Sequence, residues 1–493
     1  MPKAAQAMDS AEEHMGVMPP KLHNPKVLLH TVASEAWTEK HFADVTIDVK
    51  GAQFQLHRLV VCESPLFRSL FLGEWKEHQK VYTLAVEDDL VTAASFEAVV
   101  ATMYGRDMGL NMDNAKGFYA AASFLQMSAV AMRCAEFVAA HLTLTNVADI
   151  LHLAATRGYL ASDVLLEACA TYYKQYAFEL RRQLLRVPLG VLRDILKSDA
   201  LAVPTEILRF RLVTDVFGAK MEAAWANLGP SSDEDNGHIE LRFEGKEDEF
   251  QDCAQTACTN RPPEGDSETS GALPALNSGR SELVELREAF VDVLENGILY
   301  EHLRDREVME VSNRLDDLGI EEGLQAFWHG MLKARLLKMA IQDMHNAEMS
   351  CSASSLCQAK GMPPFRFSCE LEDVMNVGLF GRWESDKCFY AGSNWWMKVE
   401  GGKDKQGSQG LGVRLCCASA VKCDCEYVNK LIPHVQVTIR CGEVRKVIDK
   451  DGSRWLAPTD FFLRTSRLKL CLTETGSLRF VVLIKLNLNA RWL

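Results

Sequence analysis

The sequence predicts an α+β protein of several domains: a mixed α/β domain near the N-terminus, a helical middle and a C-terminal antiparallel β-sandwich. Three observations predict this class. The chain has 493 residues, too many for one ordinary core, so about two to four domains are expected. Hydrophobic residues at 47% and charged residues at 25% are globular values. Near residue 362 the spacing of apolar residues changes from helical to alternating.

A β-hairpin is the first predicted element. In "DVTIDVKGAQFQLH" apolar and polar residues alternate on both sides of the Lys50-Gly51 turn. Asp44 precedes the first strand, and His57 ends the second. The pattern predicts two paired strands with one buried face.

A helix start follows the hairpin at Ser64-Pro65. Serine is a good N-cap, and proline suits the first helical position, where its missing N–H costs nothing. His57, Cys62 and Ser64 together hold the residue types of a nucleophile and its base. Ser64, however, lacks the flanking glycines of a nucleophile elbow. We therefore expect these residues to be structural and predict no catalytic residue, so the protein is not expected to be an enzyme.

The order of segments over residues 24–142 resembles the BTB/POZ domain. These segments are "FADVTIDVKGAQFQLHRLVVCESPLFRSLF", "VYTLAVEDD", "SFEAVVATMYG" and "AKGFYAAASFLQMSAVAMRCAEFV". The signature positions that match are Asp44, His57, Ser64, Phe67, Tyr104 and Gly105.

The resemblance implies two partners for this domain. BTB domains dimerise through an apolar helix, which "NPKVLLHTVASEAWTEK" resembles; Leu28, Leu29 and Val32 would lie at the interface of a homodimer. BTB proteins that engage cullin-3 carry a hydrophobic-x-Glu signature in the loop after the next helix. Trp75 and Glu77 match it and would contact the cullin.

Residues 143–228 resemble the helical BACK domain. The rhythm of paired helices fits, with Ser198-Asp199 at a helix end and Glu206 at a helix start. Residues 282–361 resume helical spacing and would be further helices, as the rest of the BACK domain.

An acidic linker or insertion is predicted between these helices, over residues 229–281. Its Gly, Pro, Ser, Asp and Glu content cannot bury enough apolar area to offset the entropy of ordering, so we expect disorder. Residues 230–270 hold twelve acidic and three basic residues, a net −9 of the chain's −13. The acidity is therefore local. No basic patch with interleaved aromatic residues predicts nucleic-acid binding.

The pattern of residues 362–493 predicts short strands separated by Gly-rich turns, which is typical of a β-sandwich. "FYAGSNWWMKVE" resembles a MATH-type strand, with Tyr390, Gly392 and Trp395 as matching positions. Certain plant BTB–BACK proteins carry a similar C-terminal β domain. Its implied role is to bind an as yet unknown protein substrate.

Two motifs in this region suggest other chemistry. "CCASAVKCDC" holds Cys416, Cys417, Cys423 and Cys425, but not the two knuckles of a zinc site, so core cysteines and no metal are predicted. "EGGKDKQGSQGLG" has Asp404 where a phosphate loop needs Ser or Thr, so a hairpin loop and no cofactor are predicted.

Together these resemblances predict a homodimeric substrate adaptor similar to the BTB–BACK receptors of cullin-3 ubiquitin ligases. The alternative is a BTB scaffold or transcriptional corepressor without cullin contact. The N-terminus does not resemble a secretion signal, and no run reaches 18 apolar residues, so we expect an intracellular protein of cytoplasm or nucleus with no membrane segment.

Overall fold

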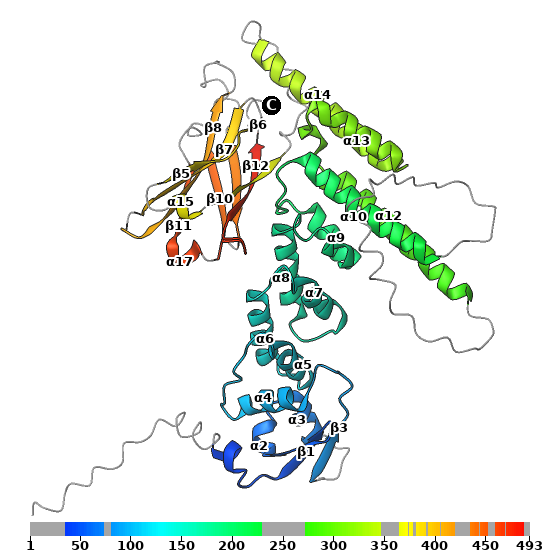
Figure 1. The fold of residues 1–493 in the computed structure, drawn as a ribbon, viewed down its shortest axis with the longest axis vertical. Helices are drawn as coiled ribbons and strands as arrows, with labels where there is room; N and C mark the ends of the chain where they lie inside the picture. Colours follow the sequence, from blue (N-terminus) through cyan, green and yellow to red (C-terminus); the bar gives the residue numbers. More distant parts are fainter. Residues whose placement is uncertain are drawn as a thin grey trace, which may run out of the picture. The chain divides into compact units, whose positions relative to one another are not determined.

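The structure is a computed structural model that describes residues 35–72, 80–228, 272–346, 364–372, 374–377, 381–390, 393–404, 406–419, 434–442, 444–451, 459–468 and 470–487. The chain divides into two compact units. The first unit comprises Met1–Leu142 and Asp149–Cys169, and the second Thr143–Ala148 and Ala170–Leu493. Figure 1 follows the chain from its blue N-terminal elements to its red final strand. None of the described helices combines the length and the apolar character needed to cross a membrane. The predicted α+β class is confirmed.

The first unit contains a three-stranded sheet in the order β2-β1-β3. Its strands are β1 (Val45–Val49), β2 (Ala52–Leu56) and β3 (Val81–Leu84). β1 and β2 form the predicted hairpin, with Ile47 opposite Phe54, and β3 pairs with β1 in parallel. The alternating residues of β1 point into the core, where Ile47 is fully buried.

The rest of this domain is helical. They are α2 (Arg58–Val61), α3 (Pro65–Leu72), α4 (Ala93–Met103), α5 (Ala115–Phe124) and α6 (Ser128–Ala140). α4 begins with a capping box between Thr92 and Ser95 and buries Phe96 and Val99 completely. It ends at the C-cap Tyr104, after which Gly105 has a φ of 76° that terminates the helix.

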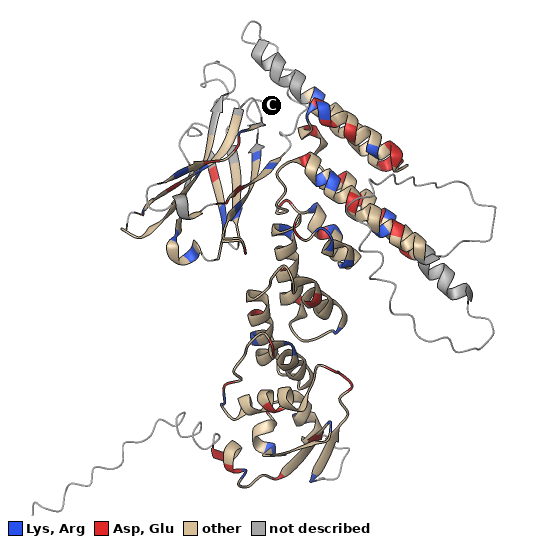
Figure 2. Ribbon diagram, in the orientation of Figure 1, with Lys and Arg blue, Asp and Glu red and all other residues tan. Residues whose placement is uncertain are grey.

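Helices fill the middle of the chain. They are α7 (Val147–Thr156), α8 (Ser162–Gln175), η1 (Gln183–Arg186), α9 (Leu189–Lys197), α10 (Glu206–Leu228), α12 (Ala272–Gly297), η2 (Tyr300–His302), α13 (Asp305–Asp317) and α14 (Glu321–Asn346). Acidic and basic residues intersperse along α10, α12 and α13 (Figure 2), although Glu206 and Arg209 of α10 are buried. α12 begins at Ala272, within the last residues of the segment predicted as a linker. Pro274 lies in the first turn, where a helix tolerates proline.

The C-terminal region of the second unit contains two antiparallel sheets, in the orders β10-β9-β12-β4 and β11-β8-β7-β5, with β6 also paired to β7. The strands are β4 (Phe365–Leu371), β5 (Arg382–Glu384), β6 (Cys388–Tyr390), β7 (Ser393–Lys403), β8 (Gln409–Ser419), β9 (His434–Cys441), β10 (Val444–Asp451), β11 (Thr459–Arg464) and β12 (Leu478–Asn487). Two short helices, α15 (Val374–Val377) and α17 (Thr465–Leu468), accompany them.

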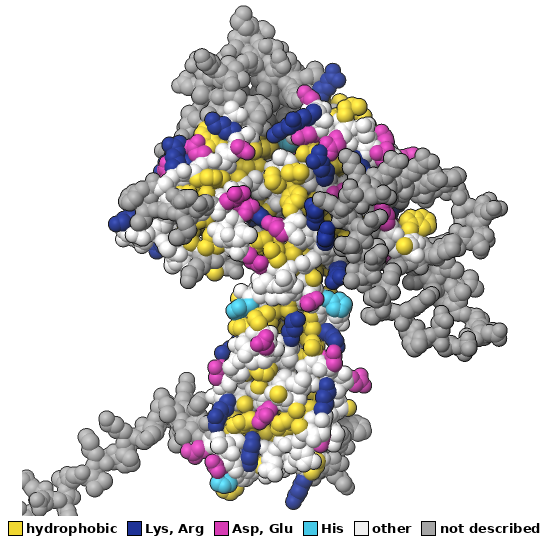
Figure 3. Space-filling view, in the orientation of Figure 1, with side chains coloured by type: hydrophobic (Ala, Val, Ile, Leu, Met, Phe, Trp, Pro, Cys, Tyr) yellow, Lys and Arg dark blue, Asp and Glu magenta, His cyan; other side chains and the backbone are white. Residues whose placement is uncertain are grey.

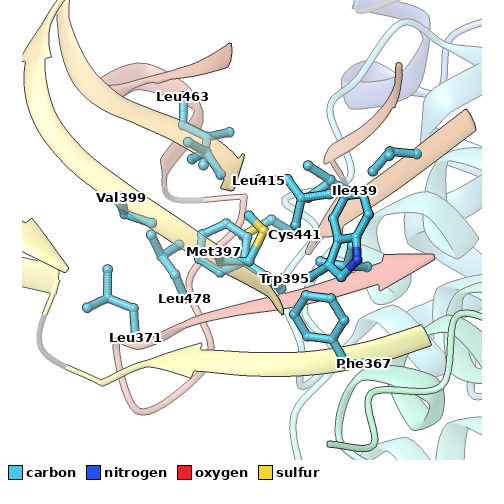
Figure 4. Close-up of a cluster of buried hydrophobic side chains, with 14 of the residues drawn as sticks. Phe367, Leu371, Trp395, Met397, Val399, Leu415, Ile439, Cys441, Leu463 and Leu478 are labelled. Atoms are coloured by element: carbon cyan, nitrogen blue, oxygen red, sulfur yellow. The ribbon is translucent and has the colours of Figure 1, made fainter. Parts of the chain in front are cut away.

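Side chains from both sheets form one core. Phe367 and Ile439 come from the four-stranded sheet, and Trp395, Met397 and Leu415 from the other (Figure 4). Each of these side chains is at most 6% exposed. The shared core makes the region the predicted antiparallel β-sandwich.

The glycine-rich segment between β7 and β8 is a hairpin loop. The Asp404 carboxylate accepts hydrogen bonds from the backbone N–H groups of Gln406 (2.9 Å) and Ser408 (2.8 Å). It also forms an ion pair with Arg464 at 2.9 Å. The carboxylate thus binds these two N–H groups, so they are not available to a phosphate. The predicted hairpin is confirmed.

Candidate functional site

His57 and Tyr104 form the polar centre of the first unit. The hydroxyl oxygen of Tyr104 accepts the His57 backbone N–H at 2.9 Å and lies 3.1 Å from Nδ1 of the same residue. The other ring nitrogen, Nε2, lies 2.7 Å from the carbonyl oxygen of His41. Because a carbonyl only accepts, Nε2 carries the proton and Nδ1 accepts from the Tyr104 hydroxyl. Burial raises the pKa of Tyr104 to about 12, so this hydroxyl remains a donor.

Asp44 and Ser64 make backbone contacts around this centre. The Asp44 carboxylate accepts the backbone N–H of Arg58 at 2.8 Å, at the start of α2. The buried Ser64 hydroxyl donates to the carbonyl of Leu125 at 2.6 Å and accepts the Phe67 N–H at 3.4 Å. Ser64 therefore caps α3 and ties it to the end of α5. Its hydroxyl proton is directed at a carbonyl rather than at an imidazole base.

The inward face of α3 is aromatic. Phe67 stacks on Phe71 with ring centroids 5.7 Å apart and meets Phe96 edge-on at 6.3 Å. The Arg58 guanidinium also lies over the rings of Phe71 (5.2 Å) and Tyr82 (5.7 Å). This packing fixes the direction in which α3 leaves the core.

The predicted cullin contact lies just beyond α3. Trp75 and Glu77 belong to residues 73–79, which are outside the described residues. Exposed residues lie on both sides of this segment: Leu72 at the end of α3 is 72% exposed, Lys80 directly after the segment is exposed, and Val81 at the start of β3 is 50% exposed.

The predicted dimer residues Leu28, Leu29 and Val32 also lie outside the described residues. The chain downstream of them is helical over residues 35–39, and Trp37 packs on Tyr104 with ring centroids 5.1 Å apart.

The second unit contains a buried ion pair that was not predicted. Arg366 of β4 binds Glu206 with contacts of 2.7 and 3.1 Å, and Asp199 with one of 2.7 Å. It also donates to the carbonyl of Gly297. Burial alone would raise the pKa of Glu206, but the Arg366 guanidinium holds it below its ordinary value. Asp199 and Glu206 are the helix-end and helix-start acids singled out in the sequence. Their partner was missed, although an arginine inside the apolar "FRFSCEL" was a visible signal.

A second missed arginine, Arg479 of β12, joins the same two regions. It contacts Glu370 at 2.9 Å, forms an ion pair with Glu179 and lies 5.5 Å over the ring of Tyr176. Its side chain is 13% exposed. The sandwich is therefore held to the helices of its unit by two separate arginines, Arg366 and Arg479.

The predicted MATH-like positions and the cysteine cluster are only partly described. Trp395 is 4% exposed, and its indole N–H donates to the carbonyl of Tyr390 at 3.0 Å. Gly392, Cys423 and Cys425 lie outside the described residues, as does the side chain of Cys417, whereas Cys416 is half-buried. Over the part of the chain that is described, no three His, Cys, Asp or Glu side chains are grouped to hold a metal ion.

Residues 34–142 match the BTB/POZ domain family, and this part of the chain is a BTB/POZ domain. The chain is also similar to Kelch-like protein 21 of Bos taurus, at 30% identity over 184 residues, which are 36% of this chain and 30% of the relative. Kelch repeat and BTB domain-containing protein 4 of Mus musculus is 31% identical over 176 residues, which are 34% and 32% of the two chains. The chain thus spans about a third of the length of the curated relatives it matches.

Proposed function

We propose that the protein is a non-enzymatic, homodimeric substrate adaptor of a cullin-3 ubiquitin ligase. The observation that carries the proposal is the BTB/POZ domain over residues 34–142 together with its Kelch-like relatives. The similarity to these relatives runs over 184 residues and so extends beyond the BTB match. Such an adaptor does no bond chemistry; it raises the local concentration of substrate lysines near the ligase.

Each part of the chain has a role in this proposal. Leu28, Leu29 and Val32 form the dimer contact, and Trp75 and Glu77 hold the cullin. The exposed Leu72 directly before the Trp75 segment supports this placement, because interface centres are apolar and aromatic. The helices from residue 143 onward form a BACK-like spacer, and the MATH-like sandwich captures the protein substrate inside the cell, in cytoplasm or nucleus.

The test is co-purification of cullin-3 with the double variant Trp75→Ala, Glu77→Ala. An interface anchor is exposed in the free protein, so its truncation removes binding without opening a cavity. We expect cullin-3 to be lost while the melting temperature stays unchanged. Trp328→Ala is the matched control, because Trp328 is a tryptophan of α14 that is 53% exposed.

Two outcomes would refute the cullin contact: a double variant that binds cullin-3 normally, or one that unfolds. In either case the alternative, a BTB scaffold or corepressor without cullin, becomes the better account. The homodimer is tested separately by light scattering, in which Leu29→Asp should convert a dimer mass to a monomer mass.

A further inference from the structure

Two arginines lie directly opposite each other on the outer face of the four-stranded sheet. Arg440 of β9 and Arg445 of β10 are cross-strand partners. The turn between them begins at Gly442, with a φ of 55°, as a two-residue hairpin turn requires. A Cβ at this position would lie 2.4 Å from the carbonyl oxygen of Leu470, so glycine is required and the register is fixed. The backbone therefore holds the two cations side by side, about 5 Å apart at Cβ.

Neither guanidinium is paired with a carboxylate among the residues that the structure describes. Asp199 attracts Arg440 but already binds Arg366 at 2.7 Å. Burial lowers the pKa of Arg440, and the charge of Arg445 lowers it further. Like charges directly opposite each other destabilise a strand pair. The sheet thus keeps a positive pair that weakens it.

The surroundings of the pair are apolar on two sides. Val481 is the neighbour of Arg440 on β12, and the exposed Val447 lies two residues from Arg445 on the same face. The next acid on that face of β10, Asp449, is four residues from Arg445, roughly 13 Å along the strand. A peptide with an anionic side chain between two apolar side chains would fit this surface.

The strand that carries Arg445 is an outer strand of its sheet. β10 is eight residues long and ends the order β10-β9-β12-β4. No strand in the described ranges pairs with its free edge. Prevention of sheet association is a sufficient explanation for a charged residue on an edge strand, such as Lys446. That purpose does not explain Arg440, which lies on the second strand.

We propose that the edge of β10 binds an extended peptide whose anionic side chain, a carboxylate or a phosphate, lies opposite Arg445 and reaches Arg440. Backbone hydrogen bonds to a sheet edge select a peptide strand, and the arginine pair selects its charge. A nucleic acid cannot add a β-strand to this edge. Charges of both signs also intersperse over the visible face in Figure 3, without the extended basic field that a polyanion needs.

This inference deepens the proposed function, on which it rests for its biological meaning: the peptide would be the segment of substrate that the adaptor captures. The binding itself requires neither the cullin nor the dimer. Its test therefore uses the purified full-length chain alone, so that failure here leaves the cullin experiment unaffected.

The probe is an array of fluorescent peptides as long as β10, of alternating Val and Thr, with Glu, phosphoserine, Gln or Lys at the central position. Fluorescence anisotropy should show binding of the Glu or phosphoserine peptides that weakens with added salt, and at least about tenfold weaker binding of the Gln peptide. The Glu and phosphoserine arms decide between carboxylate and phosphate. Hydrogen exchange should slow at the β10 amides when peptide binds.

Arg440→Gln and Arg445→Gln should each weaken binding by about tenfold or more. Lys446→Gln, a neutralised cation on the opposite face of the same strand, should bind as the unaltered chain does. Without peptide, Arg445→Gln should raise the melting temperature, because it removes the like-charge contact. The proposal is overturned by anionic peptides that fail to bind, by binding that ignores both arginines, or by a lowered melting temperature of Arg445→Gln.

Discussion

Arg366 and Glu206, 160 residues apart in the sequence, are joined by two hydrogen bonds of 2.7 and 3.1 Å, and each side chain is only 5% exposed. The pair connects the first strand of the sandwich to the first turn of α10. Because both charges are out of water, each depends on the other to offset its desolvation.

Arg366→Leu should lower the free energy of unfolding of its unit by ~3–5 kcal/mol, because it leaves the Glu206 carboxylate buried and unpaired. Chemical denaturation followed by tryptophan fluorescence measures the loss. Arg382→Leu is the control, since Arg382 is 60% exposed and solvent screens its pair with Glu384, so this variant should change stability far less. Equal effects of the two variants would show that burial of the Arg366 pair carries no special weight.

His302 should make the stability of the second unit depend on pH. Its ring is buried, with Nε2 2.8 Å from the carbonyl oxygen of Pro364 and Phe365 edge-on at 5.1 Å. Burial lowers the pKa of His302 below its ordinary 6.5, against smaller opposing effects of Pro364 and the nearby acids. As the pH falls, the unfolded chain therefore binds a proton at His302 more readily than the folded chain does. Stability is full above pH 6.5 and falls by up to ~1.4 kcal/mol per pH unit below it.

His302→Gln should abolish this slope, because glutamine can still donate to Pro364 but does not titrate near pH 6.5. Melting temperatures measured across this range, for the variant and the unaltered chain, give the comparison. An unchanged slope in the variant would assign the pH dependence to another group.

Tyr104→Phe should destabilise the BTB/POZ domain by ~1–3 kcal/mol, because the His57 backbone N–H and Nδ1 both lose their partner. Tyr119→Phe is the matched control. The Tyr119 hydroxyl is buried and finds no hydrogen-bond partner among the described residues, so its removal should be neutral or stabilising. Thermal unfolding of both variants decides; a Tyr104→Phe variant as stable as Tyr119→Phe would contradict the assigned hydrogen bonds.

Arg479→Lys should cost roughly 1–2 kcal/mol although the charge is kept, because lysine cannot reach Glu179 and Glu370 with one planar fork. Arg464→Lys is the comparison, since Arg464 is 48% exposed and should lose far less. Denaturation midpoints that change equally in the two variants would count against the fork geometry.

Local patterns predicted the elements of the fold that depend on neighbouring residues. Alternation around Lys50-Gly51 predicted the β1–β2 hairpin, and Ser64-Pro65 predicted the start of α3, because a turn and a helix cap are decided within a few residues. The Ala272 start of α12 was missed, since glycine, proline and acidic residues dominated the composition around it.

Contacts between distant segments could not be predicted in this way. Asp199 and Glu206 were placed correctly at helix ends, yet nothing near them in the sequence identifies Arg366 as their partner. The same holds for Arg440 and Arg445: their facing positions follow only once the register of β9 and β10 is known.

The hydrogen bond between the Leu144 backbone N–H and the Glu474 carboxylate spans 330 residues at 2.8 Å, and Tyr172 donates its hydroxyl to the same carboxylate. A ribosome adds ~5–20 residues per second, so roughly 15–70 s of synthesis separate these partners. During that interval the helices that follow the BTB/POZ domain lack their contact with Glu474. A nascent chain stalled in this window would therefore display unfinished helices to chaperones, and a premature stop just before Glu474 should produce a chain that the cell degrades although its BTB/POZ domain is complete.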